Sequence, residues 1–411
     1  MSEEDRYKKY YHHIQRIGRQ ERKVEEEYVQ FMLEQIPFLV PDCTRIQLAL
    51  DDSPNKRYGP KVEGAGWHHD PTSQNVKATT CYGHSLVVLS LILEHPKWGT
   101  ICFPLLKRLY IRQEDLKKID KKKRPKFRTK LQLLIEMIQK VHPMLKAVNK
   151  PIQLLFDRGY VSEEVFKAMG ELGIEIVTRF KSNVNLYKLP TPPTKKRPGR
   201  PQKYGDNLKA ENIMNDGRRK LIRTTVSMYG GQQLLEYKTL ILTSHITDGK
   251  PIRVVVSRLI KRTKSKNGKP LEKVGSTGTF VSTNLDLSPE EIIASYSKRF
   301  SIEEMFKDMK EVCGLGKQQV RSLESNLACI QITTMVYALV ELWAWNKDES
   351  YLKTNRPVWD DIERRPSHKD KRTILQFELR WMNFTREYAK TINPKILNKL
   401  KYALFNPVLT T

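Results

Sequence analysis

Two aspartates follow apolar segments that share one sequence pattern. Residues 46–51 read IQLALD and residues 152–157 read IQLLFD, so Asp51 and Asp157 occupy the same place in each segment. Such apolar runs are typical of interior strands, and an acid at the carboxyl end of a strand lies where α/β proteins bind ligands. Two carboxylates on neighbouring strands suit divalent cations, which prefer oxygen ligands. A single strand-end aspartate more often starts a turn, but two matching cases in a strongly basic chain favour a metal site.

Asp52 is the alternative to Asp51 as the first acid of this site. Successive side chains on a strand point to opposite faces of the sheet, so only one of the two can join Asp157. The shared pattern selects Asp51. Asp52 is then expected to support a turn or a neighbouring side chain.

A third set of chemically capable residues lies on a predicted helix. Ser288 and Glu291 form a capping-box pattern with Pro289 at the first helical position. The helix is therefore expected to begin near Pro289 and to end near Gly314. At about 100° per residue, four of its residues fall within about 60° of one another, between an apolar face and a charged face. They are Tyr296, Arg299, Glu303 and Lys310, and we call them the polar stripe.

Two interpretations of the polar stripe are open from helical geometry alone. Long polar side chains commonly line the edge of a core, with their charged ends in water, and amphipathic surface helices carry such boundaries by default. The alternative is a catalytic surface. Glu304 lies about 100° from Glu303 around the helix and is expected to be solvated.

The spacing of the polar stripe, Y-(2)-R-(3)-E-(6)-K, resembles a motif of the DDE transposases of bacterial insertion sequences, in the cut-and-paste group. Two further segments carry the same resemblance. LFDRGY, at residues 155–160, is similar to the family's second-acid motif, D-R-[GE]-[YFA], and residues 51–53 are similar to its first, D-x-[ST], which again selects Asp51. A long β-rich insertion before the glutamate is also a family feature. The resemblance covers about residues 45–345.

The resemblance implies an RNase H-like fold with Asp51, Asp157 and Glu303 as catalytic and metal-binding residues. They would hold two Mg²⁺ or Mn²⁺ ions about 4 Å apart, for in-line attack at phosphorus. The implied activity is transposition: metal-dependent DNA cleavage and strand transfer at the ends of the protein's own element. The residues expected to contact DNA phosphates and bases are Tyr296, Arg299, Lys310 and Arg158.

The implied partner is double-stranded DNA, both transposon ends and target, bound by a homodimer on paired ends. Two alternatives remain: a transposase-derived DNA-binding protein without activity, and a nuclease without strand transfer. Excision in this group passes through a hairpin, and the insertion is where the family holds a flipped base. Here the insertion has Tyr229 and Tyr237 but no tryptophan between residues 188 and 275, so the sequence leaves the hairpin step open.

Composition limits the class of protein. The 411 residues include 73 Lys and Arg against 46 Asp and Glu, a net charge of +27, which favours polyanionic partners and salt-sensitive binding. No segment has about 18 uninterrupted apolar residues, so a membrane protein is not expected. The first residues are too polar for a signal peptide, which predicts a cytoplasmic, nucleoid-associated protein of a prokaryotic cell. The five cysteines include no CxxC pair, so neither a zinc site nor a redox motif is predicted.

A folded domain must position Asp51, Asp157 and the polar stripe. The order of the predicted elements indicates an α/β fold. A hairpin over 85–112, a helix over 130–148, a strand ending at Asp157, a helix over 162–173 and a strand over 174–180 alternate as parallel pairing requires. The expected division is a helical segment (1–44), an RNase H-like domain in two parts (45–187 and 277–346), a basic linker with a β-rich insertion (188–276) and a helical basic C-terminal region (347–411).

Two basic segments and a histidine pair are weaker signals. Residues 196–201, KRPGRP, are similar to an AT-hook, in which Arg197 and Arg200 would enter an A·T minor groove, although a solvated linker explains them equally well. The basic stretch 116–130 is expected to contact phosphates or to be simply exposed. His68 and His69, near Asp70, lack a third ligand at a metal-site spacing and are expected in a loop.

Overall fold

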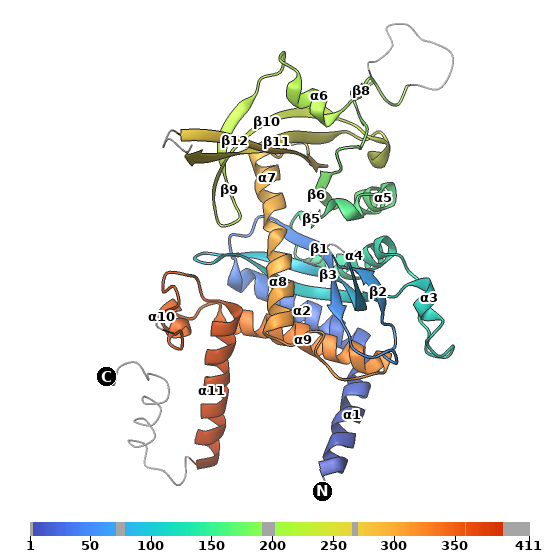
Figure 1. Cartoon of the computed structure of the whole chain (residues 1–411), viewed down its shortest axis with the longest axis vertical. Helices are drawn as coiled ribbons and strands as arrows, with labels where there is room; N and C mark the ends of the chain where they lie inside the picture. The colour runs from blue at the N-terminus through green and yellow to red at the C-terminus, as the bar shows by residue number, and fades with distance from the viewer. Residues whose placement is uncertain (1–2, 71–78, 191–201, 265–269, 358, 389–411) are drawn as a thin grey trace.

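A mixed β-sheet carries Asp51 on one of its strands, and another of its strands ends directly before Asp157. The computed structural model describes residues 3–70, 79–190, 202–264, 270–357 and 359–388 (Figure 1). The sheet has the order β2-β3-β1-β5-β6-β12-β11-β10-β9, with β4 paired to β3. Its strands are β1 (Ile46–Lys56), β2 (Gly66–His69), β3 (Thr80–His95), β4 (Gly99–Tyr110), β5 (Ile152–Phe156), β6 (Glu175–Phe180), β9 (Ile222–Met228), β10 (Gly231–Leu242), β11 (Ile252–Lys264) and β12 (Pro270–Ser282).

Helices cover both faces of this sheet and extend from one end of it. They are α1 (Glu3–Arg19), α2 (Glu21–Leu39), α3 (Gln113–Leu116), α4 (Lys130–Ala147), α5 (Glu163–Glu171), α6 (Ala210–Asn215), α7 (Pro289–Lys298), α8 (Phe300–Glu311), α9 (Leu323–Ala344), α10 (Glu349–Lys353) and α11 (His368–Tyr388). A small separate sheet pairs β7 (Leu186–Tyr187) with β8 (Asn207–Leu208). Figure 1 shows α1 and α11 extending from the same end of the molecule, away from β9–β12.

The pairing of β1 with β5 is parallel, as the matching apolar patterns predict. Leu50 pairs with Phe156, so the next residues, Asp51 and Asp157, emerge side by side at one edge. β3 pairs antiparallel with β1 and with β4, which confirms the predicted hairpin. All five residues of β5 are buried, as expected for a strand with neighbours on both sides and helices on both faces.

Alternation along β1 divides the core into two layers. Leu48 and Leu50 face a cluster formed with α2, α4 and α5, while Ala49 faces a second cluster formed with α7 and α8. Because side chains alternate with a period of two, Asp51 belongs to the α7 and α8 side, and Asp52 belongs to the α4 side. β5 follows the same rule, since Leu155 lies in the α7 and α8 cluster.

The β-rich residues of the insertion continue the same sheet and do not form a sheet of their own. β12 pairs antiparallel with β6, with Thr279 opposite Phe180, and β11, β10 and β9 follow in order. The turn signals at Gly230-Gly231 and Asp248-Gly249 lie between these strands, and Tyr229 and Asp248 have positive φ angles of 54° and 52° there, as tight turns require.

The predicted catalytic helix is present but is divided in two. Ser288 caps α7, and the capping box with Glu291 is formed. The helical path is interrupted at Arg299, and α8 ends at Glu311, a few residues before the expected Gly314. α9 is long and apolar enough to cross a membrane by length and composition, but half of its apolar window is buried in the protein, as in a core helix.

Candidate active site

The polar stripe faces Asp51 and Asp157. Asp157 directly follows β5, as predicted, whereas the prediction that Asp51 ends a strand is wrong: β1 continues to Lys56 because its pairing with β3 extends beyond Asp51. The Tyr296 hydroxyl donates to Asp157 Oδ1 at 3.2 Å. Arg299 donates to Asp51 Oδ2 at 2.8 Å through one terminal nitrogen and to Glu303 Oε1 at 2.6 Å through the other. Three carboxylates, from two strands and one helix, are thereby linked through side chains of the same helix pair.

Arg299 occupies the junction between α7 and α8, and its position there accounts for its double contact. Its side chain is 13 % exposed, against 20 % for Asp51 and 44 % for Glu303. The most exposed of the three groups is therefore the glutamate on α8. A substrate approaching from solvent would meet Glu303 before it reached Asp51.

Burial and opposite charges set the electrostatics of this edge. Burial raises the pKa of Asp51 to about 6, although Arg299 acts in the opposite direction. Burial disfavours the charged form of Arg299, but Asp51, Tyr296 and Glu303 together outweigh it and raise the pKa of the guanidinium. Burial also raises the pKa of Tyr296 to about 12, so its hydroxyl remains a donor. The negative charge of the Asp51 carboxylate is thus only partly compensated by Arg299.

Lys310 extends the stripe along β1. Its Nζ donates to Ser53 Oγ at 2.6 Å, and burial lowers the pKa of the ammonium group. Ser53 lies two residues beyond Asp51 and therefore on the same face of the strand. The stripe and one face of β1 run side by side from the acids to the end of α8.

Asp52 points to the opposite face, where it is held by two other side chains. Lys130, the first residue of α4, contacts its Oδ2 at 2.5 Å, and the Tyr160 hydroxyl donates to its Oδ1 at 2.7 Å. Sequence reasoning did not identify Lys130 or Tyr160 as partners of Asp52. Tyr160 ends the LFDRGY segment, and Thr129 caps α4 with a complete capping box, but neither signal indicates the pairing across the sheet.

The three carboxylates suit a hard divalent cation, but the Arg299 guanidinium lies among them. Within the described ranges, no three His, Cys, Asp or Glu side chains stand close enough together to hold a metal ion. The Arg299 guanidinium contacts both Asp51 and Glu303 in this structure. Three carboxylates are the ligand type that Mg²⁺ and Mn²⁺ prefer, and a cation would offset the desolvation of Asp51. By ligand type, therefore, these residues fit such a cation.

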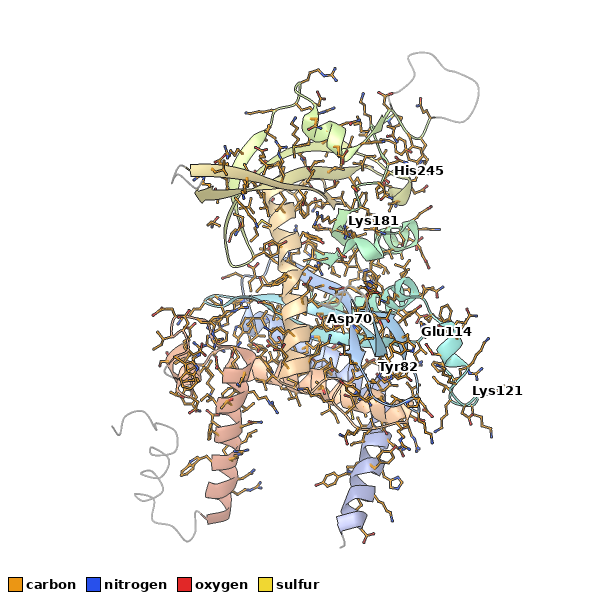
Figure 2. All side chains as sticks on the ribbon, viewed as in Figure 1. Asp70, Tyr82, Glu114, Lys121, Lys181 and His245 are labelled. Carbon is orange, nitrogen blue, oxygen red and sulfur yellow. The ribbon has the colours of Figure 1, made fainter. Side chains whose placement is uncertain are left out.

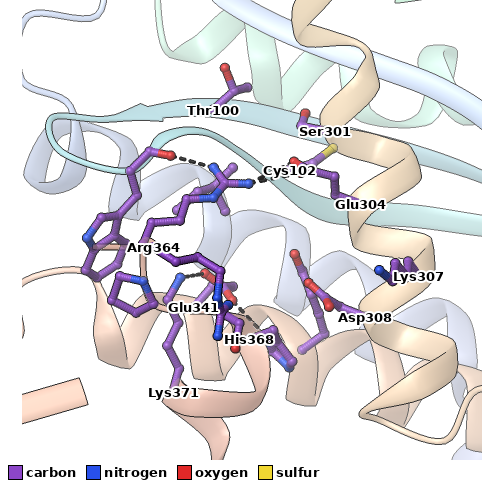
Figure 3. Close-up of a pocket in the computed structure, with 16 residues that line it drawn as sticks. Thr100, Cys102, Ser301, Glu304, Lys307, Asp308, Glu341, Arg364, His368 and Lys371 are labelled. Carbon is purple, nitrogen blue, oxygen red and sulfur yellow. Dashed lines mark hydrogen bonds and ion pairs between the residues drawn. The ribbon is translucent and has the colours of Figure 1, made fainter. Parts of the chain in front are cut away.

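Glu304 is not simply solvated, as its position on the helical wheel suggested. It forms an ion pair with Arg365 at 3.0 Å. Figure 3 shows it beside Ser301, Lys307 and Asp308, all on the side of α8 that faces a pocket of about 360 Å³. This pocket lies away from the polar stripe.

The far wall of that pocket is a buried charged cluster that attaches α11. His368 Nδ1 contacts Glu341 Oε1 at 2.7 Å, and Lys371 Nζ contacts Glu341 Oε2 at 2.5 Å (Figure 3). The Cys313 Sγ lies 3.2 Å from His368 Nε2. The cluster joins the segment that follows α8 to α9 and α11.

An aromatic pair connects the insertion to the catalytic helix. Tyr229, at the turn between β9 and β10, packs edge-to-face on Phe300 with ring centroids 5.8 Å apart. Both rings are substantially exposed, at 54 % and 43 %. Phe300 is the first residue of α8, so the insertion places an aromatic side chain against this helix without a tryptophan. No sequence pattern indicated this pairing.

The other predicted DNA contacts differ in where they lie. Arg158 is exposed in the short turn after β5, and the whole segment with Arg197 and Arg200 lies outside the described residues. Lys121, in the basic stretch 116–130, lies at the outer edge of the molecule, far from α8 (Figure 2). His68 and His69 were expected in a loop, which is wrong: they belong to β2, and pairing with β3 orders them.

Comparison with known proteins gives one result for this chain. A family model described as "Transposase DDE domain" matches residues 124–339, just over half of the chain. The match contains Asp157 and the entire polar stripe, whereas Asp51 lies before it. A search of curated proteins finds no match.

Proposed function

The chain belongs to the transposase DDE domain family, and from that premise we propose that it is an active transposase. It would cut DNA at the ends of its own element and join them to new DNA by cut-and-paste transposition. One observation carries the proposal: Tyr296 contacts Asp157, and Arg299 joins Asp51 to Glu303. A protein that only bound DNA would not need three acids brought to one edge beside the cations of the same stripe.

The proposed cofactor is a pair of Mg²⁺ or Mn²⁺ ions held by Asp51, Asp157 and Glu303. Such ions would activate the attacking oxygen and stabilise the leaving oxygen during in-line attack at phosphorus. Carboxylates from separate elements supply the anionic oxygen ligands that this chemistry needs.

The other residues of the polar stripe balance the charge of the carboxylates and position DNA. Without a metal, Arg299 screens Asp51 from Glu303. In the loaded site the same guanidinium would be free to bind a phosphate by charge-assisted hydrogen bonds. The Tyr296 hydroxyl restricts the orientation of Asp157. Lys310, held by Ser53, would contact the next phosphates of the transposon end.

The same proposal extends to the domains, the partners and the location of the protein. Residues 45–187 and 277–346 form an RNase H-like catalytic domain, interrupted by the insertion at 188–276. Segments 1–44 and 347–411 flank it, and the protein acts as a homodimer on paired ends of double-stranded DNA. Arg158, Arg197 and Arg200 add contacts to DNA, and the site of action is the nucleoid of a prokaryotic cell. The aromatic pair of Tyr229 and Phe300 is the candidate contact for an unpaired base.

The test is to incubate the full-length protein with DNA that carries the flanks of its own gene, together with a target plasmid. With Mg²⁺ we expect nicks at the element's ends and joined products, and with EDTA we expect neither. Nicking without joining would indicate a nuclease. Binding to these ends without nicking in Mg²⁺ or Mn²⁺ would indicate a non-catalytic DNA-binding protein and would contradict the proposal.

A further inference from the structure

A second polar surface begins where the active site ends. Residues 57–62, which follow β1, and residues 316–321, which follow α8, line a groove of about 680 Å³. We call it the basic groove. Its lining contains Arg57, Lys61, Lys317 and Arg321 but no aspartate or glutamate. The pocket behind α8, in contrast, is lined by acids as well as cations.

The cations of this groove are not neutralised within the protein. Lys61, Lys317 and Arg321 are exposed, and none forms an ion pair with a carboxylate in the described part of the chain. Surface lysines and arginines elsewhere are often paired, as Lys123 is with Glu324. Tyr58 is 89 % exposed beside them. Three unpaired cations and a tyrosine are the side chains that contact phosphate and sugar in DNA complexes.

Arg57 holds the two walls of the groove together, so that its shape exists before any ligand binds. Its guanidinium is buried and donates to the carbonyl oxygens of Gly316 at 3.2 Å and Val320 at 2.8 Å, and also to that of Gln318. A groove fixed in this way loses little conformational entropy on binding. Arg57 is thus a positioning residue, and the three exposed cations are the binding groups.

The groove continues the line of the active site. Asp51, Ser53 and Arg57 lie on the same face of the chain by the period of two, and Lys310 bridges to Ser53 from α8. At about 3.3 Å per residue, Arg57 lies about 20 Å from Asp51 along the strand. At about 3.4 Å per nucleotide, this distance corresponds to roughly five or six nucleotides.

We propose that the basic groove binds the phosphate backbone of the DNA that is being cut, about five nucleotides from the scissile phosphate. This inference rests on the proposed function, because it takes the acids as the point of cleavage. Lys61, Lys317 and Arg321 contact successive phosphates, and Tyr58 contacts the sugar-phosphate chain between them. The groove sets the register of the DNA and does not read its sequence.

The test compares two triple variants of the full-length protein on duplex DNA bearing the element's end. One is Lys61→Gln/Lys317→Gln/Arg321→Gln. The other is a charge-matched control on exposed lysines far from the groove, Lys146→Gln/Lys167→Gln/Lys250→Gln. Binding is measured against salt concentration. Since each phosphate contact contributes about 0.9 to the slope of log K against log salt, the groove variant should lose about 2 to 3 units, and the control should match wild type.

Ethylation interference locates the contacts along the strand. Modified phosphates about five nucleotides from the cut should inhibit wild-type binding and should not affect the groove variant. The single variant Lys317→Gln, with a slope reduced by about 1, provides the same answer if the triple variant is unstable.

Each outcome separates the two proposals. A wild-type protein that neither binds nor cuts the ends refutes the proposed function. If wild type cuts and the groove variant keeps the wild-type slope and footprint, the groove proposal is wrong and the function stands. The groove proposal is also wrong if the groove variant cuts normally and fails only when pre-cut ends must capture the target plasmid. The groove would then bind target DNA.

Discussion

Arg299 is the side chain on which the electrostatics of the site depend. It lies between Asp51 and Glu303 and is nearly buried. Removing one member of a buried ionic group leaves the others without compensation, which typically costs about 3–5 kcal/mol. A divalent cation bound by the same carboxylates would supply the missing positive charge.

We therefore expect Arg299→Gln to lower the melting temperature in EDTA and to regain much of the loss in Mg²⁺. The control is Arg258→Gln, which breaks a pair with Glu236 remote from the acids and should respond equally in both conditions. The measurement is the melting temperature of wild type and of both variants, in EDTA and in Mg²⁺. A loss for Arg299→Gln that Mg²⁺ does not reduce would contradict the assignment of these carboxylates as metal ligands.

The adjacent aspartates provide a second comparison. Asp51 faces the polar stripe, whereas Asp52 faces Lys130 and Tyr160. Asp51→Asn should reduce end cleavage by at least about 100-fold, the effect expected for loss of a group that stabilises transition-state charge. Asp52→Asn should act mainly through stability, by about 1–3 kcal/mol for a disrupted charged hydrogen bond. Cleavage rates measured below both melting temperatures test this, and equal loss in both variants would remove the distinction.

Among the elements, α8 and α11 depend on one another through the cluster around Glu341. Burial opposes ionisation of Glu341, but Lys371 and His368 outweigh it and lower the pKa of the carboxyl to about 2. Burial likewise opposes protonation of His368, but its contacts with Cys313 and Glu341 raise the pKa to about 9. Burial raises the pKa of Asp308 on α8, although His368 and Lys371 of the cluster act in the opposite direction.

The cluster predicts a loss of stability at alkaline pH. A histidine with a pKa of about 6.5 when unfolded and about 9 when folded stabilises the folded state fully below pH 6.5. This contribution disappears as the pH rises through 9. Wild type should therefore lose melting temperature between pH 7 and 10 more steeply than His368→Gln. Parallel curves for the two proteins would show that the imidazolium does not stabilise the attachment of α11.

Most elements could be predicted from the sequence because their signals are local. The capping box and the apolar patterns correctly indicated α4, α5, α7 and the hairpin of β3 and β4. The one-residue break at Arg299 could not be predicted, because the residue has ordinary helix propensity and keeps helical backbone angles at the break. Likewise, the joining of β12 to β6 depends on pairing between residues about 100 positions apart.

Across the whole molecule, the chemistry-bearing residues converge although they are distant in the chain. The edge that carries Asp51 and Asp157 follows from strand alternation and parallel pairing, both of which a sequence pattern reveals. The supporting contacts do not follow from any pattern. Lys130 with Asp52, Arg365 with Glu304 and Arg57 with the loop after α8 join segments whose proximity only the folded chain defines.

The contrast between Glu303 and Glu304 tests the central claim most directly. The two side chains are almost equally exposed, at 44 % and 43 %, and each pairs with an arginine, but only Glu303 lies in the polar stripe. The measurement is metal-dependent cleavage of the element's own ends by Glu303→Gln and Glu304→Gln, with circular dichroism as a check on folding. The account predicts that Glu303→Gln loses cleavage by at least about 100-fold while Glu304→Gln remains within a few-fold of wild type. Cleavage by Glu303→Gln at the wild-type rate would contradict it.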